Sequence, residues 1–144
     1  MSDITVVVRI QASPGTVYEV LCDIERWPEW TPTVTGVKRL DSGPLVVGSK
    51  ARVIQPKLMP VVWQITELQE NANFTWDMRS PGIAVSGGHA VTPDEAGSKV
   101  TLTLKFSGPL GPLMGHLLRT QNKRYVQAEA DGLRRHCERS YEVH

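Results

Sequence analysis

His89 is the ionisable side chain whose sequence position best suits acid–base chemistry. It stands in a strand-like segment, so if Val85 and Val91 face the interior, strand alternation turns His89 inward with them. A lone imidazole in an apolar cavity can orient a ligand oxygen or act as a general base near neutral pH. Two other interpretations stay open: a neighbouring hydroxyl satisfies the ring, or a bulge at Gly87-Gly88 breaks the alternation and leaves it in solvent. We therefore treat His89 as the candidate catalytic residue and as a candidate ligand contact.

Three polar residues in the C-terminal part of the chain are further candidate ligand contacts: Gln121, Arg124 and Tyr125. Tyr125 could offer its hydroxyl to a ligand while its ring packs against a sheet. Arg124 would suit a carboxylate or phenolate ligand if it turned inward, although an arginine on a helix usually faces solvent. We expect this group to face the interior from the middle of a helix.

Two methionines and a tryptophan are candidate lining residues for an apolar cavity. Trp76 alternates with Phe74 and Met78 along one face of a strand-like segment, a pattern more typical of a core than of a ligand site. Met59 and Met78 would give a deformable apolar lining, although methionine fills ordinary cores equally well. If the interior is hollow, we expect Met59, Trp76 and Met78 to contact what fills it.

The motifs of many enzyme classes are missing from the sequence. It contains no G-x-S-x-G, no H-E-x-x-H, no C-x-x-C and neither a phosphate-binding nor a dinucleotide-binding glycine pattern. The four histidines form no helical i, i+4 pair. We therefore expect no metal and no cofactor, so any catalysis would be acid–base chemistry in a dehydrated cavity.

Composition narrows the class of protein. The 144 residues fit one domain, 1–144, and 40% hydrophobic with 22% charged residues is typical of a globular protein. A net charge of +1 gives no long-range attraction for nucleic acid or an anionic bilayer, so we expect no nucleic-acid partner. No stretch reaches the ~18 apolar residues that span a membrane, and no signal sequence is recognisable, so we expect a cytoplasmic protein without integral membrane association. A homodimer is expected only because symmetric dimers are common.

Hydrophobic periodicity predicts a strand, a helix, six more strands and a long final helix. Residues 4–10 alternate as a half-buried strand, and Ser13-Pro14 reads as the N-cap and first position of a helix that ends near Asp23 or Arg26. The proline-containing segment 26–30 is a turn or a broken helix. From Leu113 to about Tyr141 no proline interrupts the pattern, which predicts one continuous helix. The six later strands are expected at 34–40, 50–55, 61–68, 74–79, 83–92 and 99–106.

These elements predict an α+β fold. Strands joined by short loops favour an antiparallel sheet of about seven strands, and short N-terminal helices lie between the first two. A sheet with one apolar face must be covered, and only the helical elements can cover it. Because so wide a sheet exceeds the width of one helix, we expect it to curve and grip the long C-terminal helix. A cavity can open in the middle of that curve.

The order and spacing of several short motifs resemble the START-related SRPBCC superfamily, in particular its polyketide cyclase/dehydrase-like branch with the helix-grip fold. The resemblance covers nearly the whole chain; each motif is weak alone, and together they specify the fold far better than the ligand. The motifs that carry it are Ala12-Ser13-Pro14-Gly15-Thr16-Val17-Tyr18, Asp23-Ile24-Glu25-Arg26-Trp27-Pro28-Glu29-Trp30, Pro81-Gly82, Gly97-Ser98-Lys99-Val100, Ser107-Gly108-Pro109-Leu110, and Glu129 with Gly132-Leu133.

The resemblance implies a cavity between the concave sheet face and the C-terminal helix, filled by a lipid, polyketide or other small hydrophobic molecule. It places Trp27 and Trp30 on a short helix at one cavity mouth, where they either anchor that segment or touch the ligand. Binding or carriage of such a molecule is the function we expect. The alternatives are a cyclase or dehydratase that uses His89, Tyr125 and Arg124, and an interaction module with a filled core.

Overall fold

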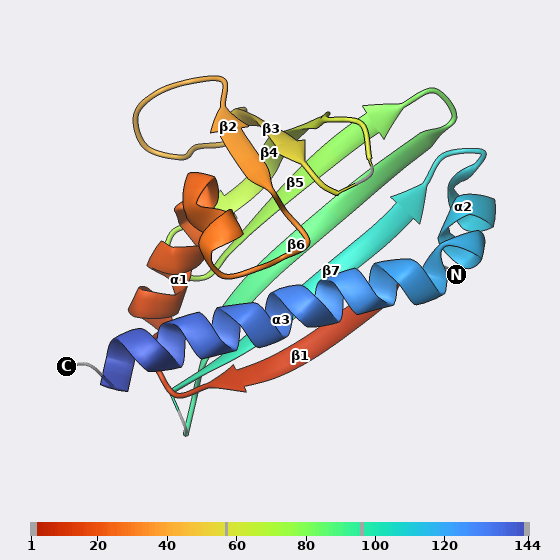
Figure 1. Cartoon of the computed structure of the whole chain (residues 1–144). Coiled ribbons are helices and arrows are strands. Elements are labelled where there is room, and N and C mark those ends of the chain that lie inside the picture. The colour runs from red at the N-terminus through yellow and green to blue at the C-terminus, as the bar shows by residue number, and fades with distance from the viewer. Residues whose placement is uncertain (1–2, 57, 96, 143–144) are drawn as a thin grey trace.

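The structure is a computed structural model that describes residues 3–56, 58–95 and 97–142. Seven strands, two short helical elements near the N-terminus and two C-terminal helices form the domain (Figure 1). In chain order they are β1 (Ile4–Ile10), α1 (Pro14–Cys22), the 3-10 helix η1 (Ile24–Glu29), β2 (Gly36–Arg39), β3 (Lys50–Ile54), β4 (Val61–Gln69), β5 (Asn73–Ser80), β6 (Ile83–Asp94), β7 (Gly97–Ser107), α2 (Gly111–Leu117) and α3 (Arg119–Glu142).

The strands form a single antiparallel sheet in the order β1-β7-β6-β5-β4-β3-β2. Six consecutive strands follow one another as a meander, and the N-terminal strand β1 joins the far side of β7. Helix α3 runs across the sheet beside β1 and β7, while α1 and η1 lie at one end (Figure 1). The α+β fold with a sheet that grips a C-terminal helix is thus confirmed.

Strand β1 shows why alternation was a reliable guide. Ile4, Val6, Val8 and Ile10 are buried, whereas Val7 on the other face is 53% exposed. Its pairing with β7 sets these apolar side chains beside the buried residues of β7, so that one face of the sheet supplies the core.

The first helix begins where the sequence predicts. Ser13 is the N-cap, its Oγ accepts a hydrogen bond from the backbone N–H of Thr16 at 3.3 Å, and Pro14 follows at the first position. The helix ends at Cys22, and the chain continues as the 3-10 helix η1, which contains Pro28. Trp27 fixes η1 to α1, because its Nε1 donates to the carbonyl of Leu21 at 2.9 Å.

The bulge that the glycine pair suggested is absent from β6. Gly87 and Gly88 pair without interruption with both β5 and β7, so the alternation that turns His89 inward is preserved. The irregularity lies instead in β4, between Ile65 and Glu67. Gly87 instead fits closely against an aromatic side chain, since a Cβ there would lie 3.1 Å from Nε1 of Trp76.

The prediction of one continuous C-terminal helix is wrong at Leu118. This residue ends α2 with φ −101° and ψ 9°, and α3 starts at the next residue. Helix α2 stays at the end of β7, whereas α3 returns across the sheet, so one straight helix could not do both (Figure 1). The break also changes which residues are buried: Leu117 and Leu118 are 64% and 37% exposed. The buried stripe of α3 is Val126, Ala130, Leu133 and Cys137.

Gly132 on α3 lies against the backbone of Trp30, the residue that follows η1. A Cβ on this residue would overlap the carbonyl oxygen of Trp30, which is backbone and has no rotamer through which to move away. Glycine is therefore required for the contact, although glycine inside a helix normally costs stability.

We expect Gly132→Ala to lower the free energy of unfolding by more than about 2 kcal/mol, because the overlap outweighs the ~1 kcal/mol gain in helix propensity. The matched control is Gly15→Ala in α1, where no atom lies within 4 Å of the added Cβ. This control should be neutral or stabilise the protein by up to about 1 kcal/mol. Urea unfolding followed by circular dichroism measures both, and equal effects at the two sites would contradict the proposed contact.

Candidate functional site

A pocket of about 370 Å³ lies between the concave face of the sheet and the N-terminal half of α3. Strands β3 to β7 provide its floor and walls, while η1 and α3 cover it. Most of its lining is apolar or aromatic, and a small number of polar groups interrupt that lining. The polar lining residues are Gln55, His89, Thr103, Gln121, Asn122, Tyr125 and Glu129.

Aromatic rings form a connected cluster at the closed side of this pocket. The ring of Trp27 lies 5.2 Å from that of Trp76 and 5.5 Å from that of His89, measured between centroids. Trp63 continues the cluster at 5.5 Å from Trp76, and both indoles line the pocket. Tilted and edge-on aromatic pairs at these separations are favourable beyond their buried area. The cluster gives the pocket a rigid wall of π faces and edges.

His89 is buried within this cluster, with 6% of its surface exposed. Its ring stacks on Phe74 at 4.2 Å, and its Nδ1 lies 3.2 Å from the carbonyl oxygen of Phe74. A carbonyl can only accept a hydrogen bond, so this contact requires the proton on Nδ1 and leaves Nε2 as an unprotonated base. Burial lowers the pKa of His89 to about 4, and the bond to Phe74 opposes that change only in part. The imidazole is therefore neutral at physiological pH.

Glu129 is a second ionisable group in the pocket, and it was not among the predicted site residues. Burial raises the pKa of its carboxyl to about 7, and a hydrogen bond from the Thr33 side chain opposes the change in part. The Thr33 hydroxyl lies 2.9 Å from that of Thr31, and both threonines are buried. The sequence held a signal for it, because Glu129 lies four residues after Tyr125 and thus on the same helix face.

Six of the nine predicted ligand contacts line the pocket. They come from four elements: Trp27 from η1, Trp76 and Met78 from β5, His89 from β6, and Gln121 and Tyr125 from α3. Trp63, from β4, also lines it and was missed, although it alternates with Val61 and Ile65 along the same strand.

Three predicted contacts lie elsewhere. Met59 is 82% exposed, because it sits in the loop between two prolines that precedes β4. Arg124 is exposed, since the residues of α3 that face the pocket at this point are its neighbours Asn122, Tyr125 and Val126. Trp30 is buried and its ring centroid lies 5.2 Å from that of Trp27, but it does not line the pocket.

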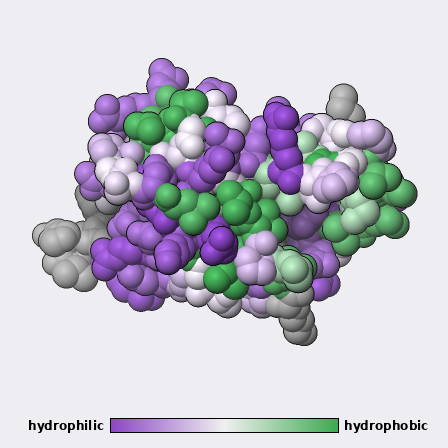
Figure 2. All heavy atoms as spheres, turned by 90° about the horizontal axis from the view of Figure 1, so that it is seen from above, coloured by the Kyte–Doolittle hydropathy of each residue, from purple (hydrophilic) through white to green (hydrophobic). Residues whose placement is uncertain are grey.

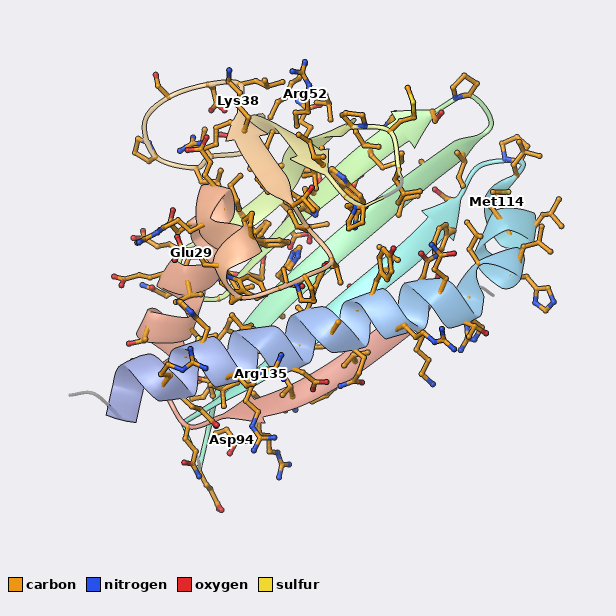
Figure 3. All side chains as sticks on the ribbon, in the orientation of Figure 1. Glu29, Lys38, Arg52, Asp94, Met114 and Arg135 are labelled. Carbon is orange, nitrogen blue, oxygen red and sulfur yellow. The ribbon has the colours of Figure 1, made fainter. Side chains whose placement is uncertain are left out.

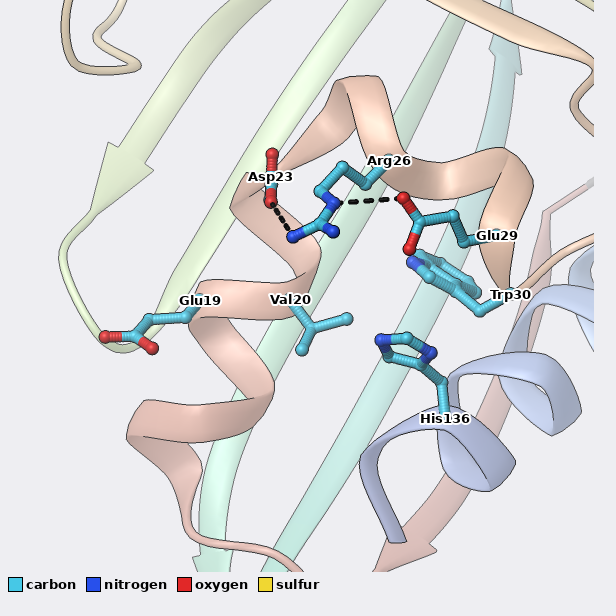
Figure 4. Close-up of a pocket in the computed structure, with 7 residues that line it drawn as sticks. All are labelled: Glu19, Val20, Asp23, Arg26, Glu29, Trp30 and His136. Atoms are coloured by element: carbon cyan, nitrogen blue, oxygen red, sulfur yellow. Dashed lines mark hydrogen bonds and ion pairs between the residues drawn. The ribbon is translucent and has the colours of Figure 1, made fainter. Parts of the chain in front are cut away.

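Trp30 lines a separate, shallow pocket between α1, η1 and α3, together with His136 and several charged residues (Figure 4). Arg26 occupies its rim and forms ion pairs there with Glu29 at 2.9 Å and with Asp23 at 3.8 Å. These side chains are more than half exposed, so the pairs contribute little to stability. Because its lining is charged, this pocket is less suited to a hydrophobic ligand than the pocket beneath α3.

Among the described residues, no group of three or more His, Cys, Asp or Glu side chains is arranged to hold a metal ion. Both cysteines, Cys22 and Cys137, are free. Across the described part of the chain, no helix combines the length and the hydrophobicity needed to cross a bilayer.

Comparison with known proteins gives a family and a fold. The model of a family described as polyketide cyclase/dehydrase and lipid transport matches residues 1–138. The sequence has no match among curated proteins.

Solved structures with the same fold are numerous, and three illustrate their range. The ZhuI aromatase/cyclase from Streptomyces sp. R1128 superposes with a TM-score of 0.75 at 18% identity, over 95% of this chain and 93% of its own. TTHA0849 from Thermus thermophilus gives 0.73 at 18% identity, over 92% and 94% of the two chains. The major latex-like protein 151 from Panax ginseng gives 0.74 at 12% identity, over 94% and 96%. At these identities the structural matches establish the fold alone.

The raised pKa of Glu129 predicts a specific pH dependence of stability. Between the ordinary glutamate pKa of about 4.5 and the folded value of about 7, the folded protein binds more protons than the unfolded chain, so the stabilising contribution fades as pH rises. We expect Glu129→Gln to raise the free energy of unfolding at pH 8 by up to about 3 kcal/mol, with little effect at pH 4.5. Urea titrations at both pH values measure this, and an equal effect at the two pH values would show that Glu129 is ionised normally.

Proposed function

We propose, since the chain belongs to the polyketide cyclase/dehydrase and lipid transport family, that it binds a small hydrophobic or amphipathic molecule in the pocket beneath α3. The observation that carries the proposal is the pocket itself. Its volume of about 370 Å³ exceeds the ~300 Å³ at the lower end of ordinary ligand sites, which argues against an interaction module with a filled core.

The composition of the lining supports the same proposal. Apolar side chains provide most of the surface, among them Val53, Val85 and Leu104 from the sheet, and burying them against a ligand is favourable by roughly 25 cal/mol per Å². The indoles of Trp63 and Trp76 offer rigid flat faces that suit a planar, conjugated ring. Gln121 and Tyr125 on α3 can hydrogen-bond a polar group of the ligand. An amphipathic aromatic molecule or a lipid fits this arrangement better than a charged metabolite.

A pocket-filling substitution tests this proposal. Val85 lines the pocket, so we expect Val85→Phe to occupy part of it and to weaken binding of a hydrophobic probe at least about tenfold. The probe is 8-anilinonaphthalene-1-sulfonate, titrated while quenching of tryptophan fluorescence is recorded, because three tryptophans line the pocket. Native mass spectrometry of the purified protein provides a second readout, a bound molecule retained from the expression host.

The matched control is Val62→Phe. Val62 lies on the outer face of β4 and is 42% exposed, so the added ring meets solvent and should leave binding unchanged. Both variants must first unfold as cooperatively as the parent protein. Absence of saturable probe binding together with absence of any retained molecule would remove the proposal.

A second candidate function, an enzyme of the cyclase or dehydratase type, is favoured by one observation. Two ionisable groups share the apolar pocket, and between their pKa values of about 4 and about 7 burial keeps each mainly in its uncharged form: His89 as a base and Glu129 as an acid. A base and an acid with separated pKa values are what proton transfer at two points of one substrate requires.

A dehydration illustrates the chemistry that this pair could perform on a β-hydroxy carbonyl compound. Nε2 of His89 takes the proton from the carbon next to the carbonyl, and the electron pair forms the new carbon–carbon double bond. The carbon–oxygen bond breaks, and the departing hydroxide takes the proton of Glu129 and leaves as water. The proton on His89 then returns to Glu129 through solvent, so the pair is restored without an added oxidant or reductant.

This candidate predicts a plateau of kcat between pH 4 and pH 7. The rate should fall below about 4, as His89 becomes protonated, and above about 7, as Glu129 loses its proton. We expect His89→Gln and Glu129→Gln each to lower kcat at least about a hundredfold, with a smaller change in KM. Asp131→Asn, an exposed change on the same helix, is the control. A rate unaffected by either pocket variant would exclude His89 and Glu129 as the base and acid and would leave the binding function intact.

A further inference from the structure

One end of the molecule carries a hydrophobic surface that extends beyond the pocket of the proposed function. Six large apolar side chains are exposed there, on the loop between β3 and β4 and on α2 with its flanking residues. Met59 is 82% exposed and Leu117 is 64% exposed, so neither belongs to the core. Figure 2 shows hydrophobic surface at the end of the molecule where α2 lies. We call this surface the rim patch; it consists of Leu58, Met59, Leu110, Leu113, Leu117 and Leu118.

The rim patch surrounds the mouth of the ligand pocket. Leu58 and Leu118 both line the pocket, and they are also 49% and 37% exposed, so the pocket reaches the surface between them. The turn between β5 and β6 completes this end, because Leu110 packs on Gly82 and its N–H donates to the carbonyl of Gly82 at 2.8 Å. The apolar surface is therefore continuous with the apolar interior.

The charges around the rim patch are predominantly positive. The segments that build this end, 55–63, 78–85 and 105–124, contain no aspartate and no glutamate. Among their described residues, the exposed cations are Arg79, Lys105, Arg119, Lys123 and Arg124.

Carboxylates gather elsewhere on the molecule. Asp94 and Glu29 mark this distribution in Figure 3, far from Met114 on α2. Asp3 is the exception, because its carbonyl accepts a hydrogen bond from Arg119 at 3.2 Å and brings one acid near this end. The net charge is only +1, but the charge is unevenly distributed. One end of the molecule is basic and apolar, and the rest has an excess of acidic residues.

We propose that the rim patch docks on the surface of an anionic lipid bilayer. Exposed leucines flanked by lysine and arginine are the combination that inserts apolar side chains at the level of the headgroups while cations contact anionic lipids. A second copy of this chain fits less well, because a symmetric contact would bring the same cations face to face.

Docking in this orientation would also set the pocket mouth against the bilayer. An amphipathic molecule could then pass between membrane and pocket without crossing water, a consequence that rests on the proposed ligand binding. The docking itself does not need a ligand, so the two can be tested separately.

The experiment is co-sedimentation of the full chain with vesicles of phosphatidylcholine containing about a third phosphatidylglycerol, compared with pure phosphatidylcholine, at low and at physiological salt. We expect binding to the anionic vesicles that weakens with salt. The double substitution Leu113→Gln with Leu117→Gln should weaken it at least about tenfold. Its matched control, Val46→Gln with Val47→Gln, alters two apolar residues of similar exposure outside the patch and should bind like the parent.

A second pair of variants tests the charges. Lys123→Glu with Arg124→Glu should weaken binding by roughly tenfold or more at low salt, since each interfacial cation is worth about fivefold. Lys38→Glu with Arg52→Glu makes the same change of net charge on the outer face of β2 and β3, where both side chains point away from the helices (Figure 3), and should have a much smaller effect.

Each remaining outcome overturns the proposal. The proposal fails if the protein does not bind anionic vesicles, or if the patch variants and the control variants lose the same amount of vesicle affinity. Sedimentation velocity that shows a dimer abolished by Leu113→Gln with Leu117→Gln, without vesicle binding, would assign the patch to a second copy. Probe binding measured on the same variants separates the two proposals, because loss of docking should leave the pocket able to bind 8-anilinonaphthalene-1-sulfonate.

Discussion

The structure depends on a nearly straight helix that must lie across a curved sheet. Helix α3 can satisfy that geometry along only part of its length, and it does so in its C-terminal half, where Ala130, Leu133 and Cys137 are fully buried. Gly132 strengthens the contact there because it allows the helix to meet the backbone at Trp30. Over the N-terminal half the helix stands away from the sheet, and residues such as Gln121 and Tyr125 face open space. Tight packing at one end and the pocket at the other are thus two results of one fit.

Burial in this pocket acts on its two ionisable groups with the same physical cause and opposite chemical results. Removing water disfavours a charge of either sign, so the pKa of His89 falls and that of Glu129 rises. Between these pKa values the pocket contains a base and an acid but no full charge, so an uncharged molecule would meet no electrostatic penalty there. At higher pH the pocket gains a negative charge, which disfavours anionic ligands.

Local patterns predicted most of the fold, and tertiary geometry explains where prediction stopped. The alternation in β1 and the Ser13-Pro14 cap are decided by residues a few positions apart, so the sequence displays them directly. The break at Leu118 has no glycine or proline at that position, and it arises because α2 and α3 must contact different parts of the sheet. Arg124 lies in α3 between Gln121 and Tyr125, but it is exposed and does not line the pocket, as is usual for an arginine on a helix. Helical spacing alone could have placed Glu129 on the same face as Tyr125. Sequence patterns do not, however, predict a carboxyl group among apolar residues, and only the structure shows it in the pocket.

The pairing of β1 with β7 has a consequence for how the chain acquires its structure. Ile4 lies opposite Leu104, so the first strand finds its partner only after some hundred intervening residues have been made. Closing so long a loop is entropically costly, and pairings of this kind slow folding. Synthesis proceeds at about 5–20 residues per second, so the apolar face of β1 remains unpaired for several seconds before β7 has been made. The N-terminal strand therefore lacks its pairing partner for most of synthesis.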